Sequence, residues 1–146
     1  MTSFQVVYDA FLGKLLEDEW ALWDEEDMKE DWKNILKGAL PQFKFPRVSL
    51  DIEIDPESEE EVFSGNLDNE EVQILATYMK CEWLNRTILT WENVKPLYEE
   101  RDFSQANLID KFRSMLEAEK KNAEKLEAKY YRSIKRQPFD YTRLAT

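Results

Sequence analysis

The sequence predicts a mainly α-helical, four-helix bundle-like domain with a long C-terminal helix and a small extended β arm or hairpin near residues 48–65. Three observations predict this fold. Apolar residues recur every three or four positions in four segments, strict alternation is confined to one short segment, and only 3 glycines and 5 prolines interrupt the 146 residues. A chain of this length fits one domain with a core of its own.

The first two helices are expected over residues 3–16 and 24–40, where apolar residues follow helical spacing. Asp24 is the candidate N-cap of the second helix, and acids fill its first turn, where the helix dipole favours negative charge. The segment EDEWALWDEED between the two helices breaks the periodicity. The tryptophans of this region are predicted to lie in the core, with partner binding as the alternative: Trp20, Trp23 and Trp32.

A change from helical spacing to strict alternation predicts an extended arm within residues 44–66. One face of this arm is apolar and carries Val48, Leu50, Ile52 and Ile54. The opposite face carries Ser49, Asp51, Glu53 and Asp55. The stretch PESEEE is expected to be an acidic loop, and VFSGNL is expected to return as a short strand, which would make the arm a small hairpin.

The third helix is expected to begin after Asp68 and to be central in the fold. Its sequence, EEVQILATYMKCEWLNRTILTWENV, carries two apolar stripes, which is typical of a helix that is covered on two sides. One stripe contains Val72, Leu75, Met79 and Trp83. The other contains Ile74, Tyr78, Cys81, Leu84 and Ile88. Pro96 excludes a longer helix.

The fourth helix is expected to be the longest, at about 30 residues or roughly 45 Å. Asp102 or Ser104 is the predicted N-cap, which would contribute about 1 kcal/mol. One side of the helix is apolar and carries Leu108, Phe112, Met115, Leu116, Ala123, Leu126, Tyr130 and Ile134. Glu119 interrupts this stripe, so the second half of the helix is expected to project past the core. Pro138 ends the helix, and an apolar, basic tail follows.

Little in the sequence supports catalysis. Histidine is absent and Cys81 is the one cysteine, which removes the commonest general base, a disulfide within the chain and a cysteine-rich zinc site. The chain has no glycine-rich phosphate loop and no nucleophile elbow. The carboxylates of DIEIDPE are interpreted as an exposed acidic face, because nothing makes them converge on a metal. A protein without enzymatic activity, metal or cofactor is predicted, with carboxylate-based metal chemistry as a third class left open.

Charge is distributed unevenly along the chain, whose formal net charge is −11. Residues 1–72 contain 20 acids and 6 bases, whereas residues 73–146 contain 11 acids and 14 bases. Such polarity can orient copies head to tail or steer a partner, or it can reflect solvated helix faces. Tyr130 and Tyr131 lie among the bases, a pattern found in single-strand nucleic-acid binders. Because the chain is acidic overall, a protein-facing or solvated surface is favoured instead.

Membrane insertion and secretion are not expected. No stretch approaches the ~20 apolar residues that a membrane-spanning helix needs. The first residues, MTSFQVVYDAFLGKL, lack the basic start and the long apolar run of a signal peptide. The default expectation is therefore the cytoplasm, without membrane contact.

Three segments together resemble small helical head–tail connector proteins, also called adaptor or neck proteins, of tailed bacteriophages. They are GALPQFKFPRVSL at 38–50, GNLDNEEVQILATYMKCEWLNRTI at 65–88 and RDFSQANLIDKF at 101–112. In order and spacing, the resemblance covers about residues 1–135. The start of the last helix is compacted relative to the family pattern, which is a small departure. None of the motifs is catalytic, so the resemblance implies a structural protein.

The resemblance implies a ring of subunits that docks on the portal protein and extends the DNA channel toward the tail. The other partners would be neighbouring adaptor subunits and a downstream neck or tail protein, and DNA would pass through the channel without sequence-specific binding. The protein would be located in the virion, in the neck between capsid and tail. Residues 1–136 would form the helical adaptor domain, with the extended arm at 44–66, and residues 137–146 a C-terminal docking tail.

Two sets of residues are predicted to make the contacts of such a ring. Docking on the portal or a neighbour is assigned to Arg132, Lys135, Arg136, Phe139, Tyr141, Arg143 and Leu144. An inter-subunit arm that pairs with a neighbour's edge strand is assigned to Val48, Leu50, Ile52 and Ile54. Capping by Asp102 and Ser104 would anchor the last helix so that its far end acts as an arm. The alternative function is a stand-alone helical protein-interaction or regulatory module.

Overall fold

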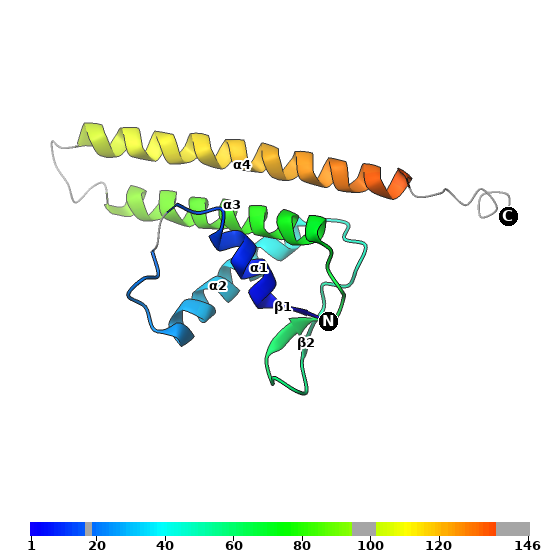
Figure 1. The fold of residues 1–146 in the computed structure, drawn as a ribbon. Helices are drawn as coiled ribbons and strands as arrows, with labels where there is room; N and C mark the ends of the chain where they lie inside the picture. Colours follow the sequence, from blue (N-terminus) through cyan, green and yellow to red (C-terminus); the bar gives the residue numbers. More distant parts are fainter. Residues whose placement is uncertain (17–18, 95–101, 137–146) are drawn as a thin grey trace.

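The structure, a computed structural model, describes residues 1–16, 19–94 and 102–136, and of residues 94, 102–106 and 134–136 it describes the backbone only. Helices dominate this part of the chain (Figure 1). They are α1 (Phe4–Leu12), α2 (Glu25–Ala39), α3 (Asn69–Val94) and α4 (Asp102–Arg136), with a 3-10 turn at Leu40–Gln42. The strands are β1 (Thr2–Ser3), β2 (Ile52–Ile54) and β3 (Glu61–Phe63). The prediction of a mainly helical fold with a small hairpin is confirmed.

Helix α3 is the centre of the fold, as its two apolar stripes predicted. All nine side chains of the two stripes are buried, with at most 8% of any of them exposed. Helices α1, α2 and α4 all pack on α3. A helix that is apolar on two sides can bury both only if different elements cover each side, and here α4 covers one side while α1 and α2 cover the other (Figure 1).

A four-helix bundle, however, is not confirmed. Helices α3 and α4 lie side by side, but α1 and α2 are shorter and lie across α3 instead of continuing the parallel stack (Figure 1). Helix α1 ends at Leu12, four residues before the predicted end, and Gly13 caps it with its backbone N–H donating to Asp9. A helix of 9 residues is too short to line the whole length of a partner of 26 residues.

The expectation that the second half of α4 projects past the core is wrong up to Tyr130. Helices α3 and α4 are antiparallel, and three side-chain pairs mark their register: Glu92 with Arg113, Lys80 with Glu119, and Glu71 with Tyr130. Ala123 and Tyr130, both in the second half of α4, are completely buried. Glu119 interrupts the apolar stripe because it forms an ion pair with Lys80 of α3 at 2.9 Å, not because the helix leaves the core.

The start of α4 also differs from the expected one. The helix begins at Asp102, so Ser104 lies inside its first turn and does not precede it. Asp102 is itself the first helical residue, and the side chains of both residues lie outside the described residues, so capping by either stays a prediction. The structure does show a complete cap at the start of α3. There Glu71 N–H donates to Asp68 Oδ1 and Asp68 N–H donates to Glu71 Oε1, each at 2.9 Å.

The hairpin belongs to a three-stranded antiparallel sheet in the order β1-β3-β2. Phe63 of β3 lies opposite Ile52 of β2 on one side and opposite Thr2 of β1 on the other. The strand is shorter than predicted, because it begins at Ile52 and not at Val48. Before Ile52 the chain is held by isolated hydrogen bonds, from Gly65 N–H to Ser49 O and from Ser64 N–H to Asp51 O. Strand β1 was not expected, since its pairing joins residues about sixty positions apart.

Replacing Gly65 by alanine is expected to lower the free energy of unfolding by about 1–3 kcal/mol. A Cβ at this position would lie 2.5 Å from the carbonyl oxygen of Ser49 and 3.0 Å from its nitrogen, so the two backbones would have to separate. Urea titration would measure the change. Gly13→Ala is the matched control, because its nearest atom would lie 3.4 Å away and its φ is −64°. An equal loss of stability in both variants would contradict the close approach at Gly65.

Candidate interaction surfaces

The residues predicted to dock are only partly described, and the docking tail at 137–146 lies outside the described residues. Arg132 lies on α4 with its side chain exposed, and the backbone of Lys135 and Arg136 forms the last turn of the same helix. The remaining residues assigned to docking lie outside the described residues: Phe139, Tyr141, Arg143 and Leu144. Their role in docking therefore stays a prediction.

Four exposed bases precede the tail along the outer surface of α4. They are Lys121, Lys125, Lys129 and Arg132, and they are called the basic stripe below. Their spacing of four, four and three residues places them on one side of the helix. Tyr130 is completely buried and Tyr131 is half-buried, so neither presents an exposed ring face beside these bases. The basic stripe therefore lacks the aromatic stacking surface that single-strand nucleic-acid binders use.

Three tyrosines instead bind two buried carboxylates between α3 and α4. Tyr130 donates its hydroxyl proton to Glu71 at 2.9 Å. Tyr78 and Tyr131 both donate to Glu127, which is 8% exposed. Burial, followed by the hydrogen bond to Glu127, raises the pKa of Tyr78. Each buried carboxylate is thus satisfied by hydroxyl donors, which is the condition for a buried charge to be tolerated.

This network also attaches the segment that follows α2 to the end of α4. The backbone N–H of Arg47 donates to the hydroxyl of Tyr130 at 2.7 Å, and the guanidinium of Arg47 lies 4.3 Å from the centre of the Tyr130 ring. Phe43 packs edge-on against the same ring and is buried. Phe45, by contrast, is 71% exposed beside Tyr131. The first segment of the family resemblance therefore lies against the end of α4, with one aromatic ring facing outward.

The four residues assigned to the inter-subunit arm do not share one environment. Val48 and Leu50 are half-buried, and Leu50 packs against the core. Ile52 and Ile54 are 39% and 67% exposed on β2, which is an edge strand. An edge strand with exposed apolar side chains can accept a further strand. The structure thus places two of the four where a neighbour could pair with them, and pairing itself stays a prediction.

Among the acids of the hairpin, Glu61 forms an ion pair with Lys33 of α2 at 2.6 Å, and the others are exposed or bind their own loop. Asp55 accepts hydrogen bonds from the backbone N–H of Glu57 and from the hydroxyl of Ser58, which closes the turn. Within residues 1–16, 19–94 and 102–136, no three metal-binding side chains come together. Cys81 is 2% exposed, and burial raises the pKa of its thiol to about 11, so it is a poor nucleophile at neutral pH.

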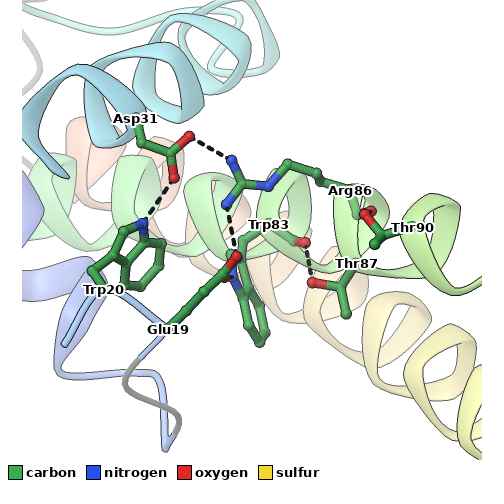
Figure 2. A network of polar contacts seen from close by, with 7 residues as sticks. All are labelled: Glu19, Trp20, Asp31, Trp83, Arg86, Thr87 and Thr90. Carbon is green, nitrogen blue, oxygen red and sulfur yellow. Dashed lines mark hydrogen bonds and ion pairs between the residues drawn. The ribbon is translucent and has the colours of Figure 1, made fainter. Parts of the chain in front are cut away.

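A polar network joins the α1–α2 connection to α3 (Figure 2). Asp31 of α2 accepts from the indole N–H of Trp20 at 2.8 Å and from Arg86 of α3 at 2.6 Å. Glu19 accepts from the indole N–H of Trp83 at 2.6 Å, and its other oxygen lies 3.7 Å from Arg86. Trp20 is buried, as is Trp32, which confirms the core prediction for these two tryptophans.

The network holds the chain before the turn through Glu19 and Trp20 and after it through Asp31, and the apolar residues of the turn itself are exposed. Leu22 is 98% exposed and Trp23 is 43% exposed, so the core prediction for Trp23 is wrong. The acids that follow are also exposed: Asp24, Glu25, Glu26 and Asp27. Residues 22–27 are called the acidic turn below. Two consecutive large apolar side chains that remain in water on an anchored turn are typical of a protein contact.

On another part of the surface, a pocket with a volume of about 320 Å³ lies between the end of α1 and helices α3 and α4. Its apolar lining consists of Leu15, Leu16, Trp83, Leu108, Phe112 and Met115. Three lysines complete the lining, one after the end of α1, one from α3 and one from α4: Lys14, Lys80 and Lys111. It is called the lysine pocket below. Burial lowers the pKa of Lys14, with nearby Glu119 acting in the opposite direction. The pocket therefore combines an apolar floor with a positive rim.

Comparison with known proteins returns no match: no protein-family model, no curated protein and no solved structure is similar to this chain. Within the described residues, no helix has the length and apolar character needed to cross a bilayer. The family resemblance of the three segments consequently remains an expectation from the sequence.

The lysine pocket was missed by sequence reasoning, and no sequence signal could have revealed it. Its lysines are separated by 66 and 31 positions, and each stands beside apolar residues that look like ordinary core positions. The acidic turn did leave a signal, because EDEWALWDEED breaks the helical periodicity while keeping large apolar residues. What the sequence could not indicate was which tryptophan stays outside.

Proposed function

We infer that this protein is a structural subunit of a head–tail adaptor ring in a tailed bacteriophage, docked on the portal and extending the DNA channel toward the tail. The three resembling segments support this inference. The observation that carries it is the separation of charge over a rigid helical scaffold, with exposed acids on α2 and the hairpin and the basic stripe on α4.

An acidic surface suits a channel through which DNA must slide. The exposed carboxylates of α2 and the hairpin repel phosphates, so a lumen lined by them would not retain DNA. The exposed acids that could line it include Glu30, Glu53 and Glu57. In this arrangement the basic stripe faces protein neighbours, because a basic lumen would bind the DNA that it has to release.

Docking on the portal is assigned to the end of α4 and the tail. The last buried contacts of α4 are those of Tyr130 with Glu71 and Arg47. After Tyr130, Tyr131 still packs against the core and Ser133 accepts a hydrogen bond from Arg47, so among the side chains described there that of Arg132 is the one left exposed to a partner. Arg132 lies two residues after the buried Tyr130, at the end of the basic stripe.

Removing residues 137–146 is expected to abolish docking while leaving the fold intact. A pull-down with the portal protein encoded in the same genome would measure docking, and circular dichroism with urea titration would measure folding. Lys121→Ala, at the far end of the basic stripe from the tail, is the matched control and is expected to dock normally. Docking that survives the truncation would refute the assignment of this tail.

The ring itself is tested by electron microscopy of the chain mixed with that portal protein. Added density in the form of a ring on the outer face of the portal is the expected result. Genomic neighbours provide a second test, since portal, capsid and tail genes should flank this one. A chain that forms no ring and stands apart from such genes would instead be a stand-alone interaction module, with its exposed apolar residues and the lysine pocket as binding surfaces.

A further inference from the structure

We propose that the acidic turn of one chain docks into the lysine pocket of a second copy of the same chain. This contact would be one through which neighbouring subunits of the proposed ring meet. Its role in a ring rests on the proposed function. The occupant is a second copy, and not an unrelated partner, because this chain carries both halves of a complementary pair.

The two surfaces match in chemistry. The acidic turn offers two exposed apolar side chains, Leu22 and Trp23, followed by four carboxylates. The lysine pocket offers an apolar floor of about 320 Å³, at the lower end of the size range of binding pockets, and three lysines at its rim. An indole from Trp23 with an adjacent carboxylate is the kind of group that such a pocket accommodates.

Carboxylates of a second chain would supply ion-pair partners for lysines of the pocket. In the described part of the chain Lys80 is already paired with Glu119 at 2.9 Å, whereas no ion pair of Lys14 or Lys111 is seen there. Lys14 is partly desolvated, which weakens its charged form, and a carboxylate close to it would restore that form. Two acids beside the pocket oppose the approach of the acidic turn: Glu119, which pairs with Lys80, and Glu19, which accepts the indole N–H of Trp83.

One chain cannot make this contact with itself. The acidic turn leads into α2, at the bottom of Figure 1, whereas the lysine pocket lies higher in the same view, where the end of α1 meets α3 and α4. The network of Figure 2 holds the connection to α2 and α3 through Glu19, Trp20 and Asp31, so the turn is fixed on its own side of the molecule. A fixed, exposed group also loses little entropy when it binds.

Because the two surfaces differ, the contact is heterologous: each chain uses its turn on one neighbour and its pocket on another. Repetition of such a contact closes into a ring if the rotation between copies permits it, and otherwise produces an open chain. A symmetric dimer would require the same patch on both subunits. The experiment below distinguishes such a dimer from the heterologous contact.

The experiment traps the contact by chemical crosslinking of two variants, each of which gains one surface cysteine and keeps the contacting side chains. Ala21→Cys lies beside the acidic turn, Ser114→Cys lies beside the lysine pocket, and both positions are exposed. One variant carries a longer tag, and the mixture at high protein concentration is treated with a short bis-maleimide. Native Cys81 is buried, and the unmodified chain shows whether it reacts.

The expected result is a crosslink between the two different variants, with little product between identical ones. Glu57→Cys on the hairpin, mixed with Ser114→Cys, is the matched control for random collision. Products between identical variants would indicate a symmetric dimer and overturn the proposal. So would a yield no higher than that of the control pair, which is also the result expected if another segment fills the pocket.

Charge reversal then tests which side chains carry the contact. Lys14→Glu with Lys111→Glu is expected to reduce the yield about tenfold, and so is Glu25→Lys with Glu26→Lys. Mixing these two reversed chains, each with its reporter cysteine, is expected to restore the crosslink, because opposite charges face each other again. Urea midpoints equal to that of the parent chain show that each variant folds. Failure of the mixture to recover would overturn the proposal.

The same variants separate this contact from the proposed function. If the contact is right and the phage assignment is wrong, crosslinks form in solution but no ring appears on the portal. If the phage assignment is right and the contact is wrong, the ring forms on the portal and Lys14→Glu with Lys111→Glu does not affect it. The two failures are therefore distinguishable in one set of preparations.

Discussion

Replacing Glu71 by alanine is expected to lower the free energy of unfolding by about 3 kcal/mol. Glu71 is 2% exposed and makes two separate contributions. Its Oε1 accepts the backbone N–H of Asp68 in the cap of α3, and its Oε2 accepts the hydroxyl of Tyr130 of α4. Loss of a cap costs about 1 kcal/mol, and loss of a buried hydrogen bond to a charged group costs about 1.5–3 kcal/mol.

Two further variants test whether these hydrogen bonds are the cause. Glu71→Gln keeps the size and one carbonyl oxygen, so about 1 kcal/mol of loss is expected. Glu70→Ala removes an exposed acid from the same first turn of α3, and its effect is expected to stay within about 0.5 kcal/mol. Urea titration measures all three variants. Similar losses for Glu70→Ala and Glu71→Ala would mean that the helix dipole, and not the buried contact, dominates.

Stability is also expected to fall steeply as the pH rises above 9. Burial raises the pKa of Cys81 from 9.0 to about 11, and burial is also the main cause that raises the pKa of Tyr8 and of Tyr78 above 10.0. Above each unfolded-state pKa the unfolded chain has lost a proton that the folded chain retains. The free energy of unfolding then falls with pH until the pH reaches the folded-state pKa.

The size of this effect follows from the number of groups involved. Each such group removes about 1.4 kcal/mol per pH unit inside its window. Cys81 acts from about pH 9 to about pH 11, and the two tyrosines act above pH 10. Urea midpoints measured from pH 8 to pH 11 would show a decline that begins near 9 and steepens above 10.

Substitutions can assign the two parts of this decline. Cys81→Ala is expected to flatten the part between pH 9 and pH 10, although it lowers stability at neutral pH by leaving a small cavity. Tyr8→Phe keeps the ring that packs against Phe4 and Trp32, and it should reduce the slope above pH 10 by one group's share, because Tyr78 still titrates there. An unchanged slope in Cys81→Ala would show that the thiol does not titrate differently in the two states.

Local patterns were enough to predict most of the helical fold. The two apolar stripes of α3 required cover on two sides, and both are buried. Asp24 and Asp68 lie directly before the residues at which α2 and α3 begin, although only the side chain of Asp68 makes a capping hydrogen bond. These features depend on neighbours three or four positions apart, whose geometry is the same in any helix. The alternation near residue 52 likewise predicted a strand, although tertiary hydrogen bonds shortened it to Ile52–Ile54.

The candidate surfaces were much less predictable, for a physical reason. Glu119 looked like a break in an apolar stripe, but Lys80 of α3 lies opposite and pairs with it. Trp20 and Trp23 look equivalent in the sequence, yet Asp31 binds the indole of Trp20 while Trp23 remains exposed. In both cases the environment of a side chain depends on a residue of another helix, and sequence spacing does not indicate which residue that is.

By itself, the sequence determined the mainly helical class, the central position of α3, and the separation of acidic and basic charge along the chain. These properties follow from short-range periodicity and from composition, which are the same before and after folding. Only the tertiary structure decided that α4 lies against α3 as far as Tyr130, that Leu22 and Trp23 stay outside, and that three distant lysines surround one pocket. Such convergence depends on how the helices pack, because packing brings together residues that no local pattern connects.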